Sequence, residues 1–371
     1  MSETVVVGGG LVGTLIALRL AESGHTVRVL DRDRPGREAS IAAAGILAAQ
    51  SEGARPGPAF ELAFESLGLH AALDEELRAT TGAGSGYVKV GALELANSDA
   101  HRESMVKTTA WQRDRGLAVD VYDATMLCLM APGVNPRFAG ALGFPDDAVV
   151  DPTALMAGAL AAAAARGVRF EHGVSVLEVL AAGGRTTGVR TDQGVRGADT
   201  VVLCAGAWSA LIGGGLADPR LVRPARGQIA EVTLHPVPFA TILHAAGGYL
   251  VPRASGRVCI GSTMEDVGFE RGTTVGGVRT LLDRAVEVVP ALASAALNQT
   301  WSGFRPMTPD GLPLVGALGI DGLFVATGHH RSGIVLAPIT ATMVRDLIVH
   351  GRRHPHLDAL DPLRFKGSSP A

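Results

Sequence analysis

The pattern of apolar and polar positions is clearest at the start of the chain. A β-branched run, Thr4–Val7, precedes a glycine-rich stretch, and leucines then recur at helical spacing between Thr14 and Ser23. This helical pattern ends at Gly24, and a second β-branched run follows at Thr26–Leu30. The order predicts strand, glycine turn, helix and strand, which is the first βαβ unit of a dinucleotide-binding fold.

The same two periodicities predict further elements along the chain. Helices are expected over 56–81, 103–116, 151–167 and 277–289, with a last helix that ends near His350. Strands are expected over 87–96, 168–172, 175–182, 187–191, 200–203, 228–234, 249–252, 257–261 and 323–326. The stretch 132–150 is expected to be rich in loops.

Three of the predicted strands lie far apart in the chain and suggest one common sheet: Thr4–Val7, Thr200–Leu203 and Leu323–Ala326. The pieces between them would then form an inserted domain. We therefore expect an α/β fold with a Rossmann-type domain assembled from residues 1–85, 147–220 and 301–371. An α+β substrate domain with a mixed or antiparallel sheet would comprise residues 86–146 and 221–300.

Composition narrows the class of protein. Lysine and arginine number 33 against 36 acidic residues, and no basic block is present, so we expect no nucleic-acid partner. Cys128, Cys204 and Cys259 are widely spaced, which argues against a zinc site or a disulfide framework and fits a reducing cytosol. The sequence shows no uncharged apolar segment long enough to span a bilayer, so we expect a cytoplasmic protein without membrane contact.

The glycine-rich stretch has the spacing of a dinucleotide fingerprint. Gly8 permits the tight turn, Gly10 lets backbone N–H groups approach a pyrophosphate, and Gly13 lets the helix pack on the strand. The helix N-terminus adds a partial positive charge. Asp31, at the end of the second strand, would accept hydrogen bonds from a ribose hydroxyl, which disfavours NADP. This motif alone does not separate NAD from FAD.

Several further segments resemble a known family. The small-residue run Arg37–Leu47 resembles the flavin-contacting loop of the D-amino-acid oxidase superfamily, in particular its glycine oxidase branch. The other matching segments are Thr200–Ser209, Gly248–Arg253, Gly261–Met264, Gly303–Pro306, Thr308–Gly311, Thr327–Ile334 and Leu336–Pro338. They occur in the family's order and cover nearly the whole chain, so the resemblance implies FAD as the cofactor.

The resemblance also implies roles at the substrate. Arg305 would bind the substrate carboxylate as a bidentate fork, Tyr249 would donate its hydroxyl to the same carboxylate, and Met264 and Arg331 would line the pocket. Without the resemblance, Tyr249 and Met264 would be core residues, and Arg331 could instead pair with an acidic residue. His330 and Ser332 depart from the family, where an aromatic residue and asparagine are frequent, which leaves the substrate open.

The resemblance implies a larger set of residues around the cofactor. They are Gly8, Gly10, Leu11, Val12, Gly13, Asp31, Arg32, Ser40, Ala43, Ala44, Gly45, Ile46, Val174, Cys204, Ala205, Gly206, Trp208, Gly303, Arg305, Gly328, His329, Arg331, Ser332, Gly333 and Ile334. No cysteine lies near Arg305–Thr308, where some sarcosine oxidases attach flavin, so we expect non-covalent FAD. His329 and His330 lack a third ligand at suitable spacing, so no metal site is expected.

These features imply an FAD-dependent amine oxidase acting on glycine or an N-substituted glycine. A hydride would pass from the substrate Cα to flavin N5, the imine would hydrolyse to glyoxylate plus amine or ammonia, and O2 would yield H2O2. No dedicated base is needed, although His329 and His330 are alternatives for that role. Other readings are a longer N-carboxymethyl amino acid as substrate, an FAD dehydrogenase, or a non-catalytic flavoprotein subunit. A homo-oligomer is compatible with the sequence.

Overall fold

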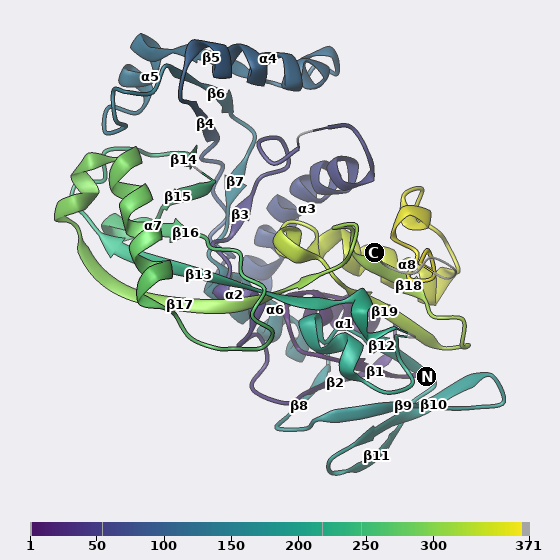
Figure 1. Cartoon of the computed structure of the whole chain (residues 1–371). Coiled ribbons are helices and arrows are strands. Elements are labelled where there is room, and N and C mark those ends of the chain that lie inside the picture. Colours follow the sequence, from purple (N-terminus) through teal and green to yellow (C-terminus); the bar gives the residue numbers. More distant parts are fainter. Residues whose placement is uncertain (1, 54, 217, 246, 366–371) are drawn as a thin grey trace.

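The computed structural model describes residues 2–53, 55–216, 218–245 and 247–365. Its first layer is a six-stranded sheet with the order β18-β19-β12-β1-β2-β8 (Figure 1). The strands are β1 (Glu3–Val7), β2 (Thr26–Asp31), β8 (Arg169–His172), β12 (Thr200–Leu203), β18 (Leu314–Ala317) and β19 (Leu323–Thr327). β1 pairs in parallel with both β2 and β12, and β12 pairs in parallel with β19. The expectation that three distant strands share one sheet is therefore confirmed.

Helices cover one face of this first sheet, and the other face packs against Val179 and Val189, because the central strands are apolar on both faces. α1 (Leu11–Glu22) packs against α6 (Pro152–Ala165) and α8 (Ala337–His350), and α3 (Pro58–Thr81) packs against α6 and α8. The resulting core includes the fully buried Leu15, Ile16 and Leu18 of α1. Pro338 lies in the first turn of α8, where the missing N–H costs no helical hydrogen bond.

The second layer is an eight-stranded, largely antiparallel sheet with the order β17-β13-β16-β15-β14-β4-β6-β5. Its strands are β4 (Ala92–Ala96), β5 (Asp120–Asp123), β6 (Gly140–Phe144), β13 (Arg223–Thr233), β14 (Ile242–Ala245), β15 (Gly248–Pro252), β16 (Arg257–Gly261) and β17 (Ala296–Met307). α7 (Val275–Val288) packs against β13, β15 and β16, and α4 (Asp99–Asp114) and α5 (Ala124–Met130) pack against β6. This mixed sheet and the first one make the fold a two-part α/β architecture, as expected.

The long strands β13 and β17 connect the two layers. They pair antiparallel from Arg223 opposite Met307 to Thr233 opposite Ala296, and in Figure 1 they extend from the second sheet towards the first. The indole N–H of Trp301 in β17 donates to the carbonyl of Ala42 in the short helix α2 (Ala39–Ala42) at 3.1 Å. β17 crosses the expected domain boundary between residues 300 and 301. The proposed domain division stays a prediction.

Several element boundaries differ from the sequence-based expectation. The stretch 132–150 contains β6 and also β7 (Ala148–Val149), which pairs with β3 (Ile46–Leu47). β6 contains two glycines that lie against Tyr122 of β5. A Cβ on Gly140 would be 2.1 Å from the Tyr122 carbonyl oxygen, and a Cβ on Gly143 would be 2.6 Å from the Tyr122 ring. α4 begins at Asp99, where the Ser98 hydroxyl caps the helix by accepting from the His101 N–H.

A small three-stranded sheet completes the fold. It consists of β9 (Val176–Ala182), β10 (Arg185–Thr191) and β11 (Gly194–Gly197), which pair antiparallel. Figure 1 places it beside β8, away from the second sheet. Among the described residues, no helix is long and apolar enough to cross a membrane.

Candidate active site

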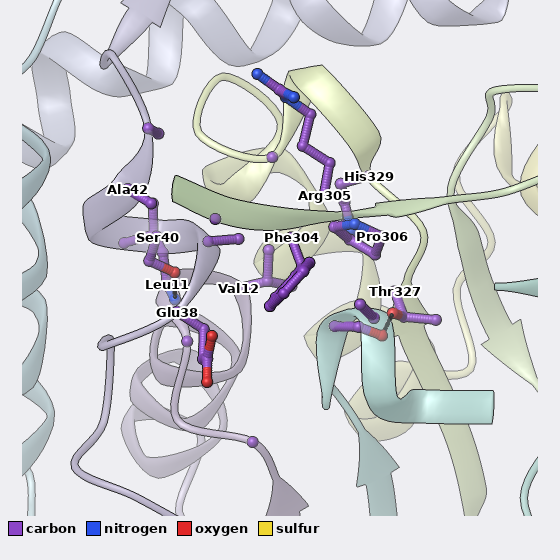
Figure 2. Close-up of a pocket in the computed structure, with 18 of the residues that line it drawn as sticks. Leu11, Val12, Glu38, Ser40, Ala42, Phe304, Arg305, Pro306, Thr327 and His329 are labelled. Atoms are coloured by element: carbon purple, nitrogen blue, oxygen red, sulfur yellow. Dashed lines mark hydrogen bonds between the residues drawn. The ribbon is translucent and has the colours of Figure 1, made fainter. Parts of the chain in front are cut away.

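A cavity of about 410 Å³ is lined by residues of both large sheets. The turn after β1, the end of β2 and the turn after β12 contribute one part of the wall, and β13, β15 and β17 contribute another. Figure 2 shows Phe304 and Arg305 leaving the strand on opposite sides, with Arg305 pointing away from Leu11, Ser40 and Glu38. We call the part formed by Gly8–Gly13, Asp31 and Ser40 the nucleotide end. The part formed by Glu52, Tyr249, Arg305 and Arg331 is called the charged end.

Most of the residues expected around the cofactor line this cavity. They are Gly8, Gly10, Leu11, Val12, Gly13, Asp31, Arg32, Ser40, Ala43, Ala44, Gly45, Ile46, Val174, Cys204, Ala205, Gly206, Trp208, Gly303, Arg305, His329, Arg331, Ser332, Gly333 and Ile334. Tyr249 also belongs to the wall. Segments separated by more than three hundred residues therefore meet at one cavity, and the cofactor roles of these residues stay a prediction.

Two expected site residues lie outside the lining. A Cβ on Gly328 would be 2.4 Å from Thr308 Cγ2, so this glycine gives room for the packing of its neighbours. Met264 is 51% exposed, and its sulfur lies 3.5 Å from Nε2 of His330. Met264 therefore contacts the lining residue His330, and a direct pocket role for Met264 stays a prediction.

The nucleotide end is shaped by glycine backbone. Gly8 has a φ of +104°, and a Cβ there would lie 2.5 Å from the carbonyl oxygen of Cys204 in the turn after β12. A Cβ on Gly13 would lie 2.1 Å from the carbonyl oxygen of Gly8. The N-cap of α1 is Gly10, which offers no side chain to satisfy the helix N–H groups. This geometry places the positive end of the helix dipole at the cavity wall, where it would attract a diphosphate.

Two side chains complete the nucleotide end. Asp31 accepts a hydrogen bond from the Gly9 N–H at 2.7 Å, and burial raises the pKa of its carboxyl group. The Ser40 hydroxyl accepts from the Leu11 N–H at 2.9 Å, which ties the small-residue run to the start of α1. Beside them, the guanidinium of Arg32 lies 3.8 Å from the centre of the Trp208 ring.

The charged end requires small residues on neighbouring strands. A Cβ on Gly227 of β13 would lie 2.1 Å from Nη1 of Arg305, so the guanidinium lies directly over this glycine. A Cβ on Gly261 of β16 would lie 2.3 Å from the Tyr249 ring. Arg305 donates to the Thr263 carbonyl at 3.2 Å and to the Ser262 hydroxyl at 2.7 Å. These contacts hold the guanidinium in one orientation at the cavity wall.

The protonation states at the charged end favour binding of an anion. Burial lowers the pKa of Arg305, yet an arginine remains charged in proteins. Burial raises the pKa of Tyr249 to about 12, so its hydroxyl stays a donor at neutral pH. Arg331 pairs with Glu52 at 2.8 Å, and this carboxylate raises the pKa of Arg331. Arg331 therefore forms an ion pair with an acidic residue, which the sequence analysis named as an alternative role for it.

Two histidines adjoin this end as neutral groups. Burial lowers the pKa of His329 to about 4, and its Nε2 lies 3.1 Å from the hydroxyl of Thr340. Burial and the nearby Arg305 lower the pKa of His330 to about 4 as well. His330 has a positive φ of 48°, which is uncommon for a residue other than glycine. Neither histidine lies in a metal-binding group, because the described residues contain no cluster of three or more potential ligands.

Sequence reasoning missed several lining residues. Glu52, Gly227, Ser262 and Phe304 belong to the cavity wall, and none of them was assigned a site role. Glu52 lies in a turn without any periodic pattern, and the contacts that position it come from distant residues. A glycine inside a strand signals close approach by another group, but the strand predicted from the sequence begins at Gln228 and leaves Gly227 out.

The described residues fit a flavin dinucleotide. The glycine cradle and the start of α1 suit a diphosphate, Asp31 suits a ribose, and the cavity continues to the charged end. Cys204 also lines the cavity, but burial raises the pKa of its thiol, which keeps it protonated and unreactive. The residues that would hold FAD are therefore present in a single continuous cavity.

Comparisons with known proteins show the family of the chain. A family model described as FAD dependent oxidoreductase matches residues 3–347. The bifunctional protein ThiO/ThiG of Synechocystis sp. is 36% identical over 98% of this chain, which spans 54% of that relative's length. Glycine oxidase of Geobacillus kaustophilus is 35% identical over 93% of this chain and 92% of its own length.

Solved structures show the same relationship. The crystal structure of glycine oxidase from Geobacillus kaustophilus superposes with a TM-score of 0.93, at 33% identity, covering 98% of this chain and 99% of that one. Iminodiacetate oxidase from Chelativorans sp. BNC1 gives a TM-score of 0.88 at 26% identity, covering 97% and 98%. The cavity, the family model and these relatives together show that the chain belongs to the family of FAD-dependent oxidoreductases that includes glycine oxidase.

Proposed function

We propose that this chain is an amine oxidase of the glycine oxidase type, acting on the Cα–N bond of glycine or an N-substituted glycine. The observation that carries the proposal is the charged end, where Arg305 and Tyr249 present fixed donors beside each other in the cavity. Arg305 on β17 and Tyr249 on β15 belong to one sheet and line the same cavity, which suits a single small carboxylate. The relatives named glycine oxidase support the same substrate class.

The residues would act mainly by orientation. Arg305 and Tyr249 would hold the carboxylate, which fixes the position of Cα and its hydrogen relative to the rest of the cavity. FAD, when bound, would accept the hydride and pass the electrons to O2, giving H2O2. The imine left on the substrate would react with water to give glyoxylate and an amine or ammonia. The low pKa values of His329 and His330 keep both uncharged near neutral pH, so they would add no charge beside the amine.

The cofactor would be bound without a covalent bond. Of the three cysteines, which are free thiols, Cys204 lines the cavity in a buried, protonated state, and Cys259 is buried in the second sheet. Acid precipitation of the holoprotein should therefore release all of the yellow chromophore into the supernatant. Flavin that stays with the precipitate would contradict non-covalent binding.

A longer N-carboxymethyl amino acid is the second candidate substrate. Arg331 gives the cavity a second guanidinium that could meet a second carboxylate, and iminodiacetate oxidase is among the similar structures. A dehydrogenase or a non-catalytic subunit would share the same fold.

Oxygen consumption, H2O2 and glyoxylate should be measured with glycine, sarcosine, D-alanine and iminodiacetate. Glyoxylate and H2O2 formed in equal amounts from glycine or sarcosine would support the proposal. Oxidation of iminodiacetate alone would select the second candidate. A yellow, folded protein that consumes no oxygen with any of these amines would contradict an oxidase.

A further inference from the structure

Glu52 brings a negative charge to a cavity end that otherwise carries two guanidinium groups. Its Oε1 lies 2.8 Å from Nη2 of Arg331, and both residues line the same cavity as Arg305 and Tyr249. About a third of the Glu52 side chain and half of the Arg331 side chain remain accessible, so a ligand in the cavity can reach both. The pair is therefore part of the binding wall as well as a link between two segments.

The turn that carries Glu52 is fixed by buried polar groups. Asp147 is fully buried, and its carboxylate accepts from the N–H of Gln50 at 3.1 Å and of Ser51 at 3.0 Å. The buried amide of Gln112 donates to the carbonyls of Gln50 and Gly53, each at 3.1 Å. Both ends of the turn are thus held by the protein interior, and Glu52 is presented to the cavity in a fixed place.

Three charged groups at this end of the cavity act on His330. Arg305 and Arg331 are positive, and Glu52 is negative. Nε2 of His244 lies 3.4 Å from the hydroxyl oxygen of Ser51. Burial lowers the pKa of His244, so this histidine stays neutral at neutral pH. If Arg305 binds the substrate carboxylate, a second carboxylate on the substrate would meet an arginine that is already paired and a carboxylate of its own sign.

We propose that Glu52 is a specificity-determining residue that selects substrates with one carboxylate and excludes those with two, by occupying Arg331. This inference rests on the proposed function and decides between its two candidate substrates. It predicts a preference for glycine or an N-alkyl glycine over an N-carboxymethyl amino acid. Glu52 acts here in two ways: its carboxylate repels the second carboxylate of the wrong ligand, and its ion pair keeps Arg331 from binding that carboxylate.

Binding of two unreactive ligands tests this directly. Methoxyacetate and oxydiacetate are ether analogues of sarcosine and iminodiacetate that differ in one carboxylate. Each is titrated into the holoprotein while the visible spectrum of the flavin is followed. The wild-type protein should bind methoxyacetate more tightly than oxydiacetate. In Glu52→Gln, the ratio of the two Kd values should move at least about tenfold in favour of oxydiacetate, because Arg331 becomes free to make a charge-assisted hydrogen bond.

Matched variants separate this role from a structural one. Glu52→Asp keeps the charge and should retain the wild-type order of the two ligands. Glu52→Gln combined with Arg331→Gln should lose the gain. Glu287→Gln removes an exposed carboxylate of α7 that pairs with Arg137, and it should leave the ratio unchanged.

The outcomes distinguish the inference from the proposed function. An unchanged ratio in a Glu52→Gln protein that still oxidises glycine or sarcosine would overturn only the role of Glu52. A wild-type protein that binds oxydiacetate more tightly would also overturn it, whether or not the variants fold. If the ratio shifts as expected while no amine is oxidised, the ligand selection stands and the proposed function falls. Binding of neither ligand to the wild-type protein would contradict both.

Discussion

The two ends of the cavity use different parts of the polypeptide. The nucleotide end is formed mainly by the backbone of Gly8–Gly13, where Gly8 and Gly13 are in close contact, and is completed by the side chains of Asp31 and Ser40. The charged end is formed by side chains from four separate segments, each held by its own neighbours. A cofactor that a whole family shares suits a site made of backbone, because a backbone turn changes little between relatives. Substrate choice suits a site made of side chains, because side chains change more freely.

This comparison predicts which substitutions remove the cofactor and which change the substrate. Variants at the nucleotide end should lose FAD, while variants at the charged end should keep FAD and lose or alter turnover. A substitution at either end that produced the effect expected of the other would break the distinction.

The largest effect is expected from Gly13→Ala. The added Cβ would lie 2.1 Å from the Gly8 carbonyl oxygen, so the turn and α1 must move apart. We expect loss of bound FAD, measured by the visible absorbance of the purified protein. Gly68→Ala in α3 is the control, because its Cβ meets nothing within 4 Å. A yellow Gly13→Ala protein with normal affinity for FAD would contradict the assignment of this turn.

Arg305→Ala should leave FAD bound and remove most of the turnover. The loss of two charge-assisted hydrogen bonds to the substrate carboxylate should lower kcat/KM by roughly a thousandfold. Arg223→Ala, on the paired strand β13 and half-exposed, is the control and should change kcat/KM little. Equal activity of Arg305→Ala and the wild-type protein would show that the carboxylate binds elsewhere.

Gly227→Ala should have a smaller effect of the same kind. The new Cβ would lie 2.1 Å from Nη1 of Arg305 and would displace the guanidinium without removing its charge. We expect KM to rise by about tenfold while FAD stays bound. A fall in FAD content, with KM unchanged in the remaining holoprotein, would place Gly227 at the nucleotide end instead.

The smallest effect concerns the pH dependence of stability. Burial raises the pKa of Asp147 to about 6, above its unfolded value of 3.8, so the folded state holds this proton more tightly. The stabilising contribution is complete below the unfolded pKa and is lost as the pH rises through about 6. Between pH 4.5 and 7 this amounts to roughly 2 kcal/mol for a fully buried group.

Thermal melting of the wild-type holoprotein and of Asp147→Asn at pH 4.5 and pH 7 tests whether this contribution to stability falls as the pH rises. Relative to Asp147→Asn, the wild-type protein should lose a few degrees of melting temperature between pH 4.5 and pH 7. The buried His70, whose pKa is lowered to about 4, acts in the opposite direction and is present in both proteins. If the melting temperature of the wild-type protein rose relative to that of Asp147→Asn as the pH rises, the result would contradict the raised pKa of Asp147.

The same contrast explains what the sequence could predict. The turn at Gly8–Gly13 depends on neighbours in sequence, so its spacing and the flanking strands were sufficient to predict it. Tyr249 and Arg305 were found only through the family resemblance, because their strands carry no pattern that marks a ligand site. Glu52 was missed because Asp147 and Gln112, which fix its turn, lie far along the chain.

The fold shows the same division between local and distant determinants. β1, β12 and β19 are short, mostly buried apolar runs, and they were predicted together with their common sheet. β6 and β17 were not predicted, since β6 is rich in glycine and β17 is half-exposed over much of its length. Their strand form depends on pairing with β4, β5 and β13, which the local sequence does not specify.

The central claim is that the charged end holds an amino acid by its carboxylate beside the flavin. Anaerobic mixing of the purified yellow protein with glycine, sarcosine, D-alanine and iminodiacetate tests it most directly, with the visible flavin band as the readout. The account predicts rapid bleaching by glycine or sarcosine in the wild-type protein and none by the same amines in Arg305→Ala. A wild-type protein that stays yellow with all four amines, or an Arg305→Ala protein that bleaches equally fast, would contradict it.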